Sequence, residues 1–181
     1  MPAPSLCCNP FWSALLLNRL FTVCLFAVLS VAAGCENFDF KVNDSVVFTP
    51  RELFDDFEVA DQALHDCIAQ TIADQAISAA SQLTDLNCSN AGIADLDGLA
   101  QFSGLLKLRL SSNAVRNLVE VASLTSLQEL YLDNNRVVDP VPLYKLAALR
   151  FVDLSGNADL QCPSSGGLVR VSTVTLPRHC R

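Results

Sequence analysis

The chain has 181 residues, of which 51% are hydrophobic, with eight cysteines, two histidines and a formal net charge of −7. This length and apolar content predict one folded domain and exclude a wholly disordered chain. The excess of acidic residues argues against nucleic acid as the main partner, because phosphate binding requires clustered Lys and Arg. The mean hydropathy of +0.33 is high for an acidic protein and predicts an apolar segment at one end.

The first 34 residues have the pattern of an export signal. Residues 20–34 read LFTVCLFAVLSVAAG and follow Arg19. About 15 apolar residues are too few for a membrane-spanning helix, which needs about 20, but they match the apolar region of a secretory signal peptide. The ending Val31-Ala32-Ala33-Gly34-Cys35 resembles a bacterial lipobox. This resemblance implies cleavage before Cys35 and attachment of lipid to that cysteine.

Two alternatives for this segment are ordinary cleavage after Val31-Ala32-Ala33, and an uncleaved anchor from Phe11 to Gly34. Lipidation is favoured because Cys35 falls where the apolar run ends. It predicts a chain anchored to a membrane but not spanning it, on the outer membrane or facing the periplasm of a bacterial cell. Residues 36–97 carry a net charge of −11 and residues 98–181 a net charge of +3, which we interpret as a solvated acidic segment.

The segment that follows the export signal predicts a tether and a helical cap. Residues 35–57 are acidic with scattered phenylalanines, and we expect a tether with one short strand near Val46–Phe48, although the segment can equally pack on the first repeat. Within residues 58–82, apolar residues at helical spacing predict one buried helix face, which comprises Leu64, Cys67, Ile68 and Ile72. Asp61 is placed to cap the N-terminus of this helix.

A period of 22 residues organises residues 83–160. Four segments align without gaps: LTDLNCSNAGI from Leu83, LLKLRLSSNAV from Leu105, LQELYLDNNRV from Leu127 and LRFVDLSGNAD from Leu149. The pattern L-x-x-L-x-L-x-x-N-x-I resembles the leucine-rich repeat family in its bacterial, internalin-like form. This resemblance implies an α/β fold, a short right-handed solenoid with a parallel sheet on its concave face, and a cap at each end.

The physical basis of the pattern is independent of the family name. The last two leucines of L-x-x-L-x-L are two residues apart, which places both side chains on the same side of a strand. Apolar residues on the return segments recur every third residue, which favours short 3₁₀ turns over long helices. Asparagines at the ninth position, Asn113, Asn135 and Asn157, can satisfy backbone groups at the bend, whereas the first copy has Ala91 there.

The cysteines outside the export signal mark the two caps. Cys88 replaces an inward leucine of the first strand, and Cys162 follows the last repeat. Three strand steps separate these two cysteines by about 14 Å, which is too far for a disulfide. The compatible pairing is Cys67–Cys88 and Cys162–Cys180, so that residues 161–181 form a stapled C-terminal cap in which residues 168–176 cover the open sheet end. Four free thiols or a metal site are the alternatives.

The side chains that point away from the leucine core are the candidate binding residues. We expect a protein partner of unknown identity to bind a patch comprising Lys107, Arg109, Glu129, Tyr131, Asp133, Phe151 and Asp153. The alternative is an ordinary mixed surface with ion pairs Lys107–Glu129 and Arg109–Asp153. Binding of a glycan or envelope polymer through Tyr131 and Phe151, or a purely structural role, are the other hypotheses.

An enzymatic role, a cofactor or a metal centre finds no support in the sequence. The histidines His65 and His179 fall at opposite ends of the predicted solenoid, and no nucleophile, zinc or phosphate-binding motif occurs. Asp95 and Asp97 precede Gly98 and are interpreted as a turn, in preference to a calcium site.

Overall fold

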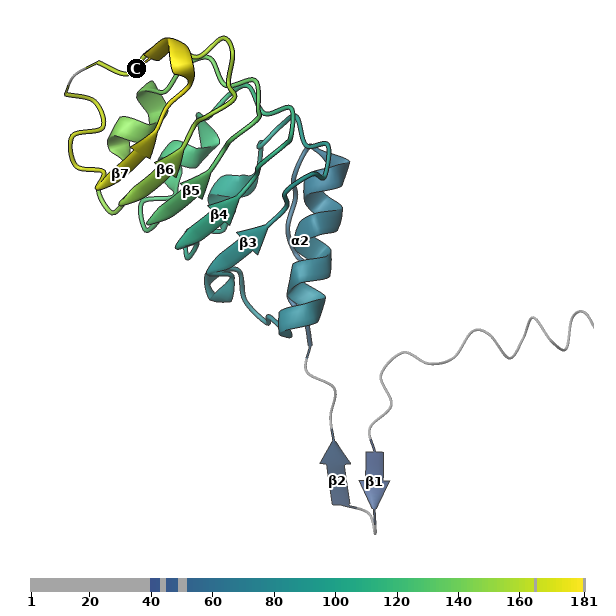
Figure 1. Ribbon diagram of the computed structural model, residues 1–181. Coiled ribbons are helices and arrows are strands. Elements are labelled where there is room, and N and C mark those ends of the chain that lie inside the picture. Colours follow the sequence, from purple (N-terminus) through teal and green to yellow (C-terminus); the bar gives the residue numbers. More distant parts are fainter. Residues whose placement is uncertain (1–39, 43–44, 49–51, 165, 181) are drawn as a thin grey trace, which may run out of the picture. The chain divides into compact units, whose positions relative to one another are not determined.

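The computed structural model describes residues 40–42, 45–48, 52–164 and 166–180, in two compact units that divide after Pro50 (Figure 1). The N-terminal unit contains an antiparallel hairpin of β1 (Phe40–Val42) and β2 (Ser45–Phe48), so the strand expected here is one of a pair. The export signal and Cys35 lie outside the described residues. Within the described part of the chain, no helix is long and apolar enough to cross a membrane.

The C-terminal unit is built on a five-stranded parallel sheet, to which each of the four 22-residue repeats contributes one strand (Figure 1). The strands stack in chain order: β3 (Asp85–Asn87), β4 (Lys107–Arg109), β5 (Glu129–Tyr131), β6 (Phe151–Asp153) and β7 (Thr173–Thr175). Their central residues, Leu86, Leu108, Leu130 and Val152, are in register and fully buried. The predicted solenoid with a parallel sheet is therefore confirmed.

The C-terminal segment covers the open end of the four repeat strands, as expected for residues 168–176, and it does so as a fifth strand of the sheet. Thr173 on β7 pairs with Phe151, which lies 22 residues earlier. The spacing of Val171, Val174 and Leu176 repeats that of the three leucines in the earlier copies. The expected C-terminal cap is therefore confirmed, but its form as a strand was not predicted, because β-branched valines, which favour strands, replace two of the leucines.

The return segments are short 3₁₀ turns, as the three-residue apolar spacing predicts. They comprise η1 (Ala80–Gln82), η2 (Leu99–Gln101), η3 (Glu120–Ser123), η4 (Val141–Lys145) and η5 (Arg178–Cys180). One apolar residue of each central turn enters the core, namely Leu99, Val121 and Leu143. The core is therefore a column of apolar side chains between the sheet and the turns.

The three asparagines at the ninth position join successive repeats. The Asn135 side chain is buried, its Nδ2 donates to the carbonyl oxygens of Leu110 (2.8 Å) and Leu132 (3.1 Å), and its Oδ1 accepts from the Val115 N–H (3.0 Å). Asn113 and Asn157 make the equivalent bonds in their repeats. This predicted ladder is confirmed from the second repeat onward.

The residue at the eighth position of each repeat has a left-handed backbone conformation, which the repeat pattern did not predict. Asn90, Ser112, Asn134 and Gly156 have φ values of 59°, 57°, 54° and 75°. Asparagine and glycine tolerate this conformation better than most residues, and serine tolerates it at a cost. The chain therefore leaves each strand through the same tight turn.

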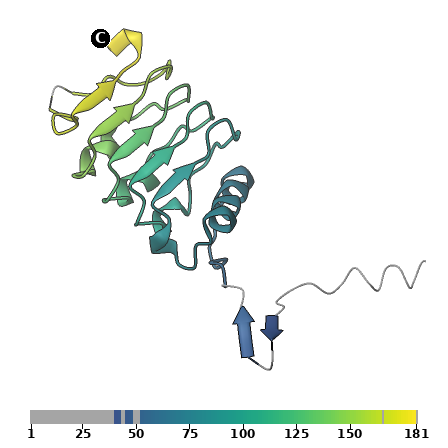
Figure 2. The same cartoon turned by 60° about the horizontal axis from the view of Figure 1, so that its bottom comes forward.

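The N-terminal cap is the helix α2 (Gln62–Gln75), which lies beside β3 at the start of the sheet (Figure 1, Figure 2). Leu64, Ile68 and Ile72 form its buried face, as predicted. Phe54 and Phe57 also contact Phe102 edge-on, with ring centroids 6.3 Å and 5.7 Å away. The end of the segment expected to be a tether therefore packs against the first repeat.

Asp61 fastens the cap to the first repeat. Its Oδ1 accepts from the N–H groups of Ala63 and Leu64 at the start of α2, as predicted, and its Oδ2 accepts from those of Ala94 and Asp95 in the first return segment. Burial opposes ionisation of this carboxyl, but the four backbone donors outweigh it, so that the pKa of Asp61 is lowered. One carboxylate thus orders two segments far apart in the chain.

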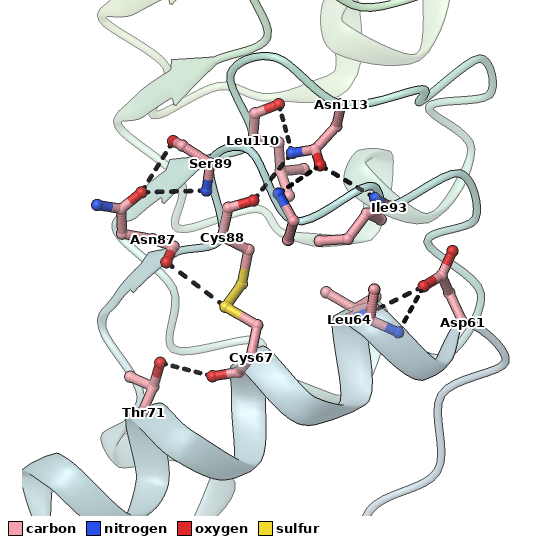
Figure 3. Close-up of a disulfide and its surroundings, with 12 residues drawn as sticks. Asp61, Leu64, Cys67, Thr71, Asn87, Cys88, Ser89, Ile93, Leu110 and Asn113 are labelled. Carbon is pink, nitrogen blue, oxygen red and sulfur yellow. Dashed lines mark hydrogen bonds between the residues drawn. A yellow bond between two sulfur atoms is a disulfide. The ribbon is translucent and has the colours of Figure 1, made fainter.

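Both predicted disulfides are present, which contradicts the alternative of free thiols. Cys67 on α2 is bonded to Cys88, which follows β3, with 5.8 Å between their Cα atoms (Figure 3). Cys162 is bonded to Cys180 in η5, with 5.2 Å between their Cα atoms. Each bond closes a short loop, and each stabilises one end of the solenoid.

The contribution of Asp61 can be tested with Asp61→Ala. We expect a loss of about 1–2 kcal/mol in the free energy of unfolding, because the helix cap and the contact with Ala94 disappear together. The matched control is Asp66→Ala on the exposed side of α2, with an expected change within about 0.5 kcal/mol. Because the folded pKa of Asp61 is lowered, its stabilisation is complete above the unfolded pKa of about 3.9 and is lost as pH falls through the folded pKa. Urea denaturation at pH 7 and pH 3 measures both effects, and equal losses for the two variants at pH 7 would contradict the assignment.

Candidate binding face

The candidate site is the concave face, defined by the side chains of β3–β6 that point away from the leucine core. Each strand is three residues long, and its middle residue is buried while the two flanking residues of β4, β5 and β6 are half-buried. All seven predicted binding residues are half-buried: Lys107, Arg109, Glu129, Tyr131, Asp133, Phe151 and Asp153. Because successive side chains of a strand point to opposite faces of the sheet, these residues lie on the face that a partner can reach.

Two ion pairs cross neighbouring strands of this face. Lys107 Nζ on β4 lies 2.6 Å from Glu129 Oε2 on β5, which confirms the predicted pair. The predicted pair between Arg109 and Asp153 is wrong, because Arg109 Nη1 contacts Asp85 Oδ1 on β3 at 2.9 Å. Asp153 is on β6, two strands from Arg109, at a separation of about 10 Å for regular strand spacing.

Tyr131 lies at the centre of the face, between Arg109 and Phe151. The Phe151 ring centroid is 4.7 Å from that of Tyr131, and Arg109 Cζ lies 5.7 Å from the Tyr131 centroid. Because β4 and β6 flank β5, these neighbours approach the tyrosine from opposite sides. The Tyr131 hydroxyl donates to Glu129 Oε2 at 3.1 Å, which joins the aromatic pair to the Lys107–Glu129 ion pair.

The ionisation of these groups is fixed by their contacts with one another. The hydrogen bond between Lys107 and Glu129 raises the pKa of the lysine and lowers the pKa of the glutamate. Burial, together with the hydrogen bond to Glu129, raises the pKa of Tyr131. The face therefore carries the charged Lys107–Glu129 pair and a neutral phenol at physiological pH.

The structure joins five of the seven predicted residues into one network: Lys107, Arg109, Glu129, Tyr131 and Phe151. The other two lie toward the ends of the strands and bond to residues outside this network. Asp133 accepts from the Ser111 hydroxyl and from Asn134 Nδ2, and Asp153 accepts from the Ser155 N–H. Sequence reasoning left Asp85 out of the patch, although its register with Lys107, one strand away, is a signal that could have placed it near Arg109.

Within the described residues, one group of three side chains has metal-ligand chemistry: Cys162, His179 and Cys180. Both sulfur atoms belong to a disulfide, so neither is a thiolate that could bind a metal. Asp95 Oδ1 accepts from the Asp97 N–H at 3.0 Å, which is the predicted turn.

Neither a protein-family model nor a curated protein sequence matches the chain. Solved structures of internalins from Listeria monocytogenes do match. InlF has a TM-score of 0.54 with 18% identity, over 64% of this chain and 43% of that chain. Internalin C2 has a TM-score of 0.42 with 31% identity, over 46% of this chain and 37% of that chain. The functional domain of InlJ has a TM-score of 0.34 with 19% identity, over 54% of this chain and 30% of that chain.

The likeness to InlF and the five stacked strands define the fold as a leucine-rich-repeat solenoid. The chain spans less than half the length of each of these internalins.

Proposed function

We propose that the chain is an exported, lipid-anchored leucine-rich-repeat protein that binds another protein at the bacterial cell envelope through its concave face. The observation that carries this proposal is the tilted ring pair Tyr131–Phe151, which is flanked by Arg109 and the Lys107–Glu129 ion pair. Tyrosine and arginine supply much of the binding free energy at protein interfaces. Aromatic side chains on an otherwise polar surface are accounted for by a partner that covers them.

The geometry supports a protein segment over a glycan. Stacking of a sugar requires an open ring face, whereas Arg109 lies over the Tyr131 ring and the Phe151 ring packs beside it with 4.7 Å between the centroids. Five strands span about 19 Å across the sheet, which suits a short peptide segment, a loop or one helix. Such an area is smaller than a standard interface, so the flanking surfaces or an avidity effect at a membrane would add to the affinity.

We infer a binding role in preference to a catalytic one. The charged groups at the centre of the face pair with one another, and the raised pKa of Tyr131 keeps its hydroxyl protonated. A general base or an activated nucleophile needs a pKa matched to its task and a free reactive atom. The network instead has the features of a preorganised recognition surface.

Disruption of the network is expected to abolish partner capture. The test is the triple variant Lys107→Glu, Arg109→Glu and Tyr131→Ala, compared with the wild type for photo-crosslinked products in envelope fractions. The control variant makes the same type of changes outside the strands, at the exposed residues Arg116→Glu, Arg136→Glu and Val119→Ala. The triple variant and the control variant should both unfold in a cooperative thermal transition, which shows that both are folded. Capture that survives in the triple variant would exclude the concave face as the binding surface, and competition by purified envelope sugars would favour the glycan hypothesis.

Release from the membrane is expected when the lipid site is removed. Cys35→Ser leaves no thiol for attachment of lipid, so the variant should move from the membrane pellet to the soluble fraction. Cys24→Ser, within the apolar run, is the matched control and should sediment like the wild type. Sedimentation of Cys35→Ser with membranes would contradict the lipoprotein proposal, and mass spectrometry of the N-terminal peptide identifies the attached chains.

A further inference from the structure

A polar hollow lies at the N-terminal end of the concave face, where the end of α2 meets β3 and β4. Its volume is about 300 Å³, and it is lined by Thr71, Asp74, Gln75, Asp85, Asn87 and Arg109. Thr71 and Asn87 lie on the same side of the Cys67–Cys88 disulfide (Figure 3). This disulfide holds α2, which forms one wall of the hollow, against the first repeat. A hollow of this size is at the lower end of the range for ligand pockets, so it suits a single side chain.

The charge of the hollow is not balanced by the chain itself. Arg109 neutralises Asp85 on one wall, at 2.9 Å. On the opposite wall, Asp74 Oδ1 accepts from Gln70 Nε2 at 2.7 Å, and among the described residues no cationic side chain pairs with it. Residues 52–97, which form the cap and the first repeat, include ten acidic residues and neither Lys nor Arg. This end of the face therefore attracts a positively charged side chain.

The hollow is continuous with the aromatic part of the face. Arg109 lines the hollow and also lies over the Tyr131 ring, which in turn contacts Phe151. From β3 to β6 there are three strand steps, or about 14 Å. An extended peptide covers this distance in about four residues.

We propose that the protein partner presents an extended segment across the strands, with a Lys or Arg side chain in the polar hollow and an apolar side chain about four residues away against Tyr131 and Phe151. This inference rests on the proposed function and adds the chemistry of the partner. The basic side chain pairs with Asp74, and the apolar side chain extends the aromatic pair. Because the hollow is open to solvent, binding weakens as salt concentration rises.

The test is a selection from a random peptide display library on the immobilised full chain, purified in detergent, with counter-selection on the variant Tyr131→Ala, Phe151→Ala. We expect enriched peptides to carry a basic residue three to five positions from an aromatic or aliphatic residue. Enriched peptides that depend on the two aromatic residues but lack the basic residue would overturn this inference and leave the proposed function standing. Absence of any enrichment that depends on Tyr131 and Phe151 would contradict both.

A synthetic probe then tests the role of Asp74. A labelled Gly/Ser peptide with Arg and Phe four positions apart is titrated by fluorescence anisotropy. Asp74→Asn should weaken its binding about two- to five-fold, which is the effect of a partly exposed ion pair. Asp66→Asn is the matched control, since Asp66 is on the same helix but does not line the hollow. Equal affinity of wild type and Asp74→Asn, or equally tight binding of a peptide with Glu in place of Arg, would overturn the assignment.

Discussion

Asn135→Ala is expected to lower the free energy of unfolding by about 3–5 kcal/mol. The Asn135 amide serves three backbone groups of two repeats, the carbonyl oxygens of Leu110 and Leu132 and the N–H of Val115. Alanine leaves the Val115 N–H without a partner, which costs about 1–3 kcal/mol. It also removes one of the two amide donors of each carbonyl oxygen, at about 0.5–1.5 kcal/mol each, because Asn113 still donates to Leu110 and Asn157 to Leu132. The loss is therefore larger than that of an ordinary surface substitution, and urea denaturation measures it directly.

The neighbouring residue provides the control for this prediction. Asn134 is exposed, and its φ of 54° is accessible to glycine, so Asn134→Gly should change the stability by less than about 0.5 kcal/mol. A loss below about 1 kcal/mol for Asn135→Ala would show that water replaces the amide, and that the asparagine ladder does not hold the repeats together.

Removal of the N-terminal disulfide, by Cys67→Ala with Cys88→Ala, is expected to cost about 3 kcal/mol. The bond spans a sequence separation of 21 residues, and the loss of this constraint on the unfolded chain accounts for most of the effect. The bond also holds α2 on the first repeat, where Leu64, Ile68 and Ile72 cover the end of the leucine core. We therefore expect local opening of the cap before global unfolding, visible as faster amide exchange in α2 than in β5.

The second disulfide is the matched control. Its sequence separation of 18 residues is similar, so Cys162→Ala with Cys180→Ala should lower the stability by a similar amount. Amide exchange in α2 should be unchanged in this variant, because Cys162 and Cys180 lie at the other end of the solenoid. Unchanged exchange of α2 after removal of Cys67–Cys88 would contradict the role of that bond in holding the cap.

The repetitive part of the fold was predictable because each structural requirement recurs every 22 residues. The leucines place the strands, the three-residue spacing places the return turns, and Asn113, Asn135 and Asn157 place the ladder. The fifth strand was not predicted because Val171 and Val174 replace leucines, and because no asparagine marks the bend. The same 22-residue offset, applied without regard to residue type, would have identified it.

The candidate site was predictable only as far as neighbouring strands determine it. Lys107 and Glu129 occupy facing positions of adjacent strands, so their contact follows from the repeat register. The predicted pair between Arg109 and Asp153 overlooked this limit, because the same register places Asp153 two strands away and Asp85 on the adjacent strand β3. The polar hollow depends on the position of α2 beside β3, which no repeat determines.

The most direct test of the proposed protein-binding role is photo-crosslinking from the concave face in cells. A benzophenone amino acid in place of Phe151 preserves an aromatic ring beside Tyr131, and the same residue at Val119, which is 59% exposed and outside the strands, is the control. We predict a discrete protein adduct from position 151 that is absent from position 119 and is identified by mass spectrometry. The same products from both positions, or no protein adduct from position 151, would contradict the proposal that the concave face binds a protein.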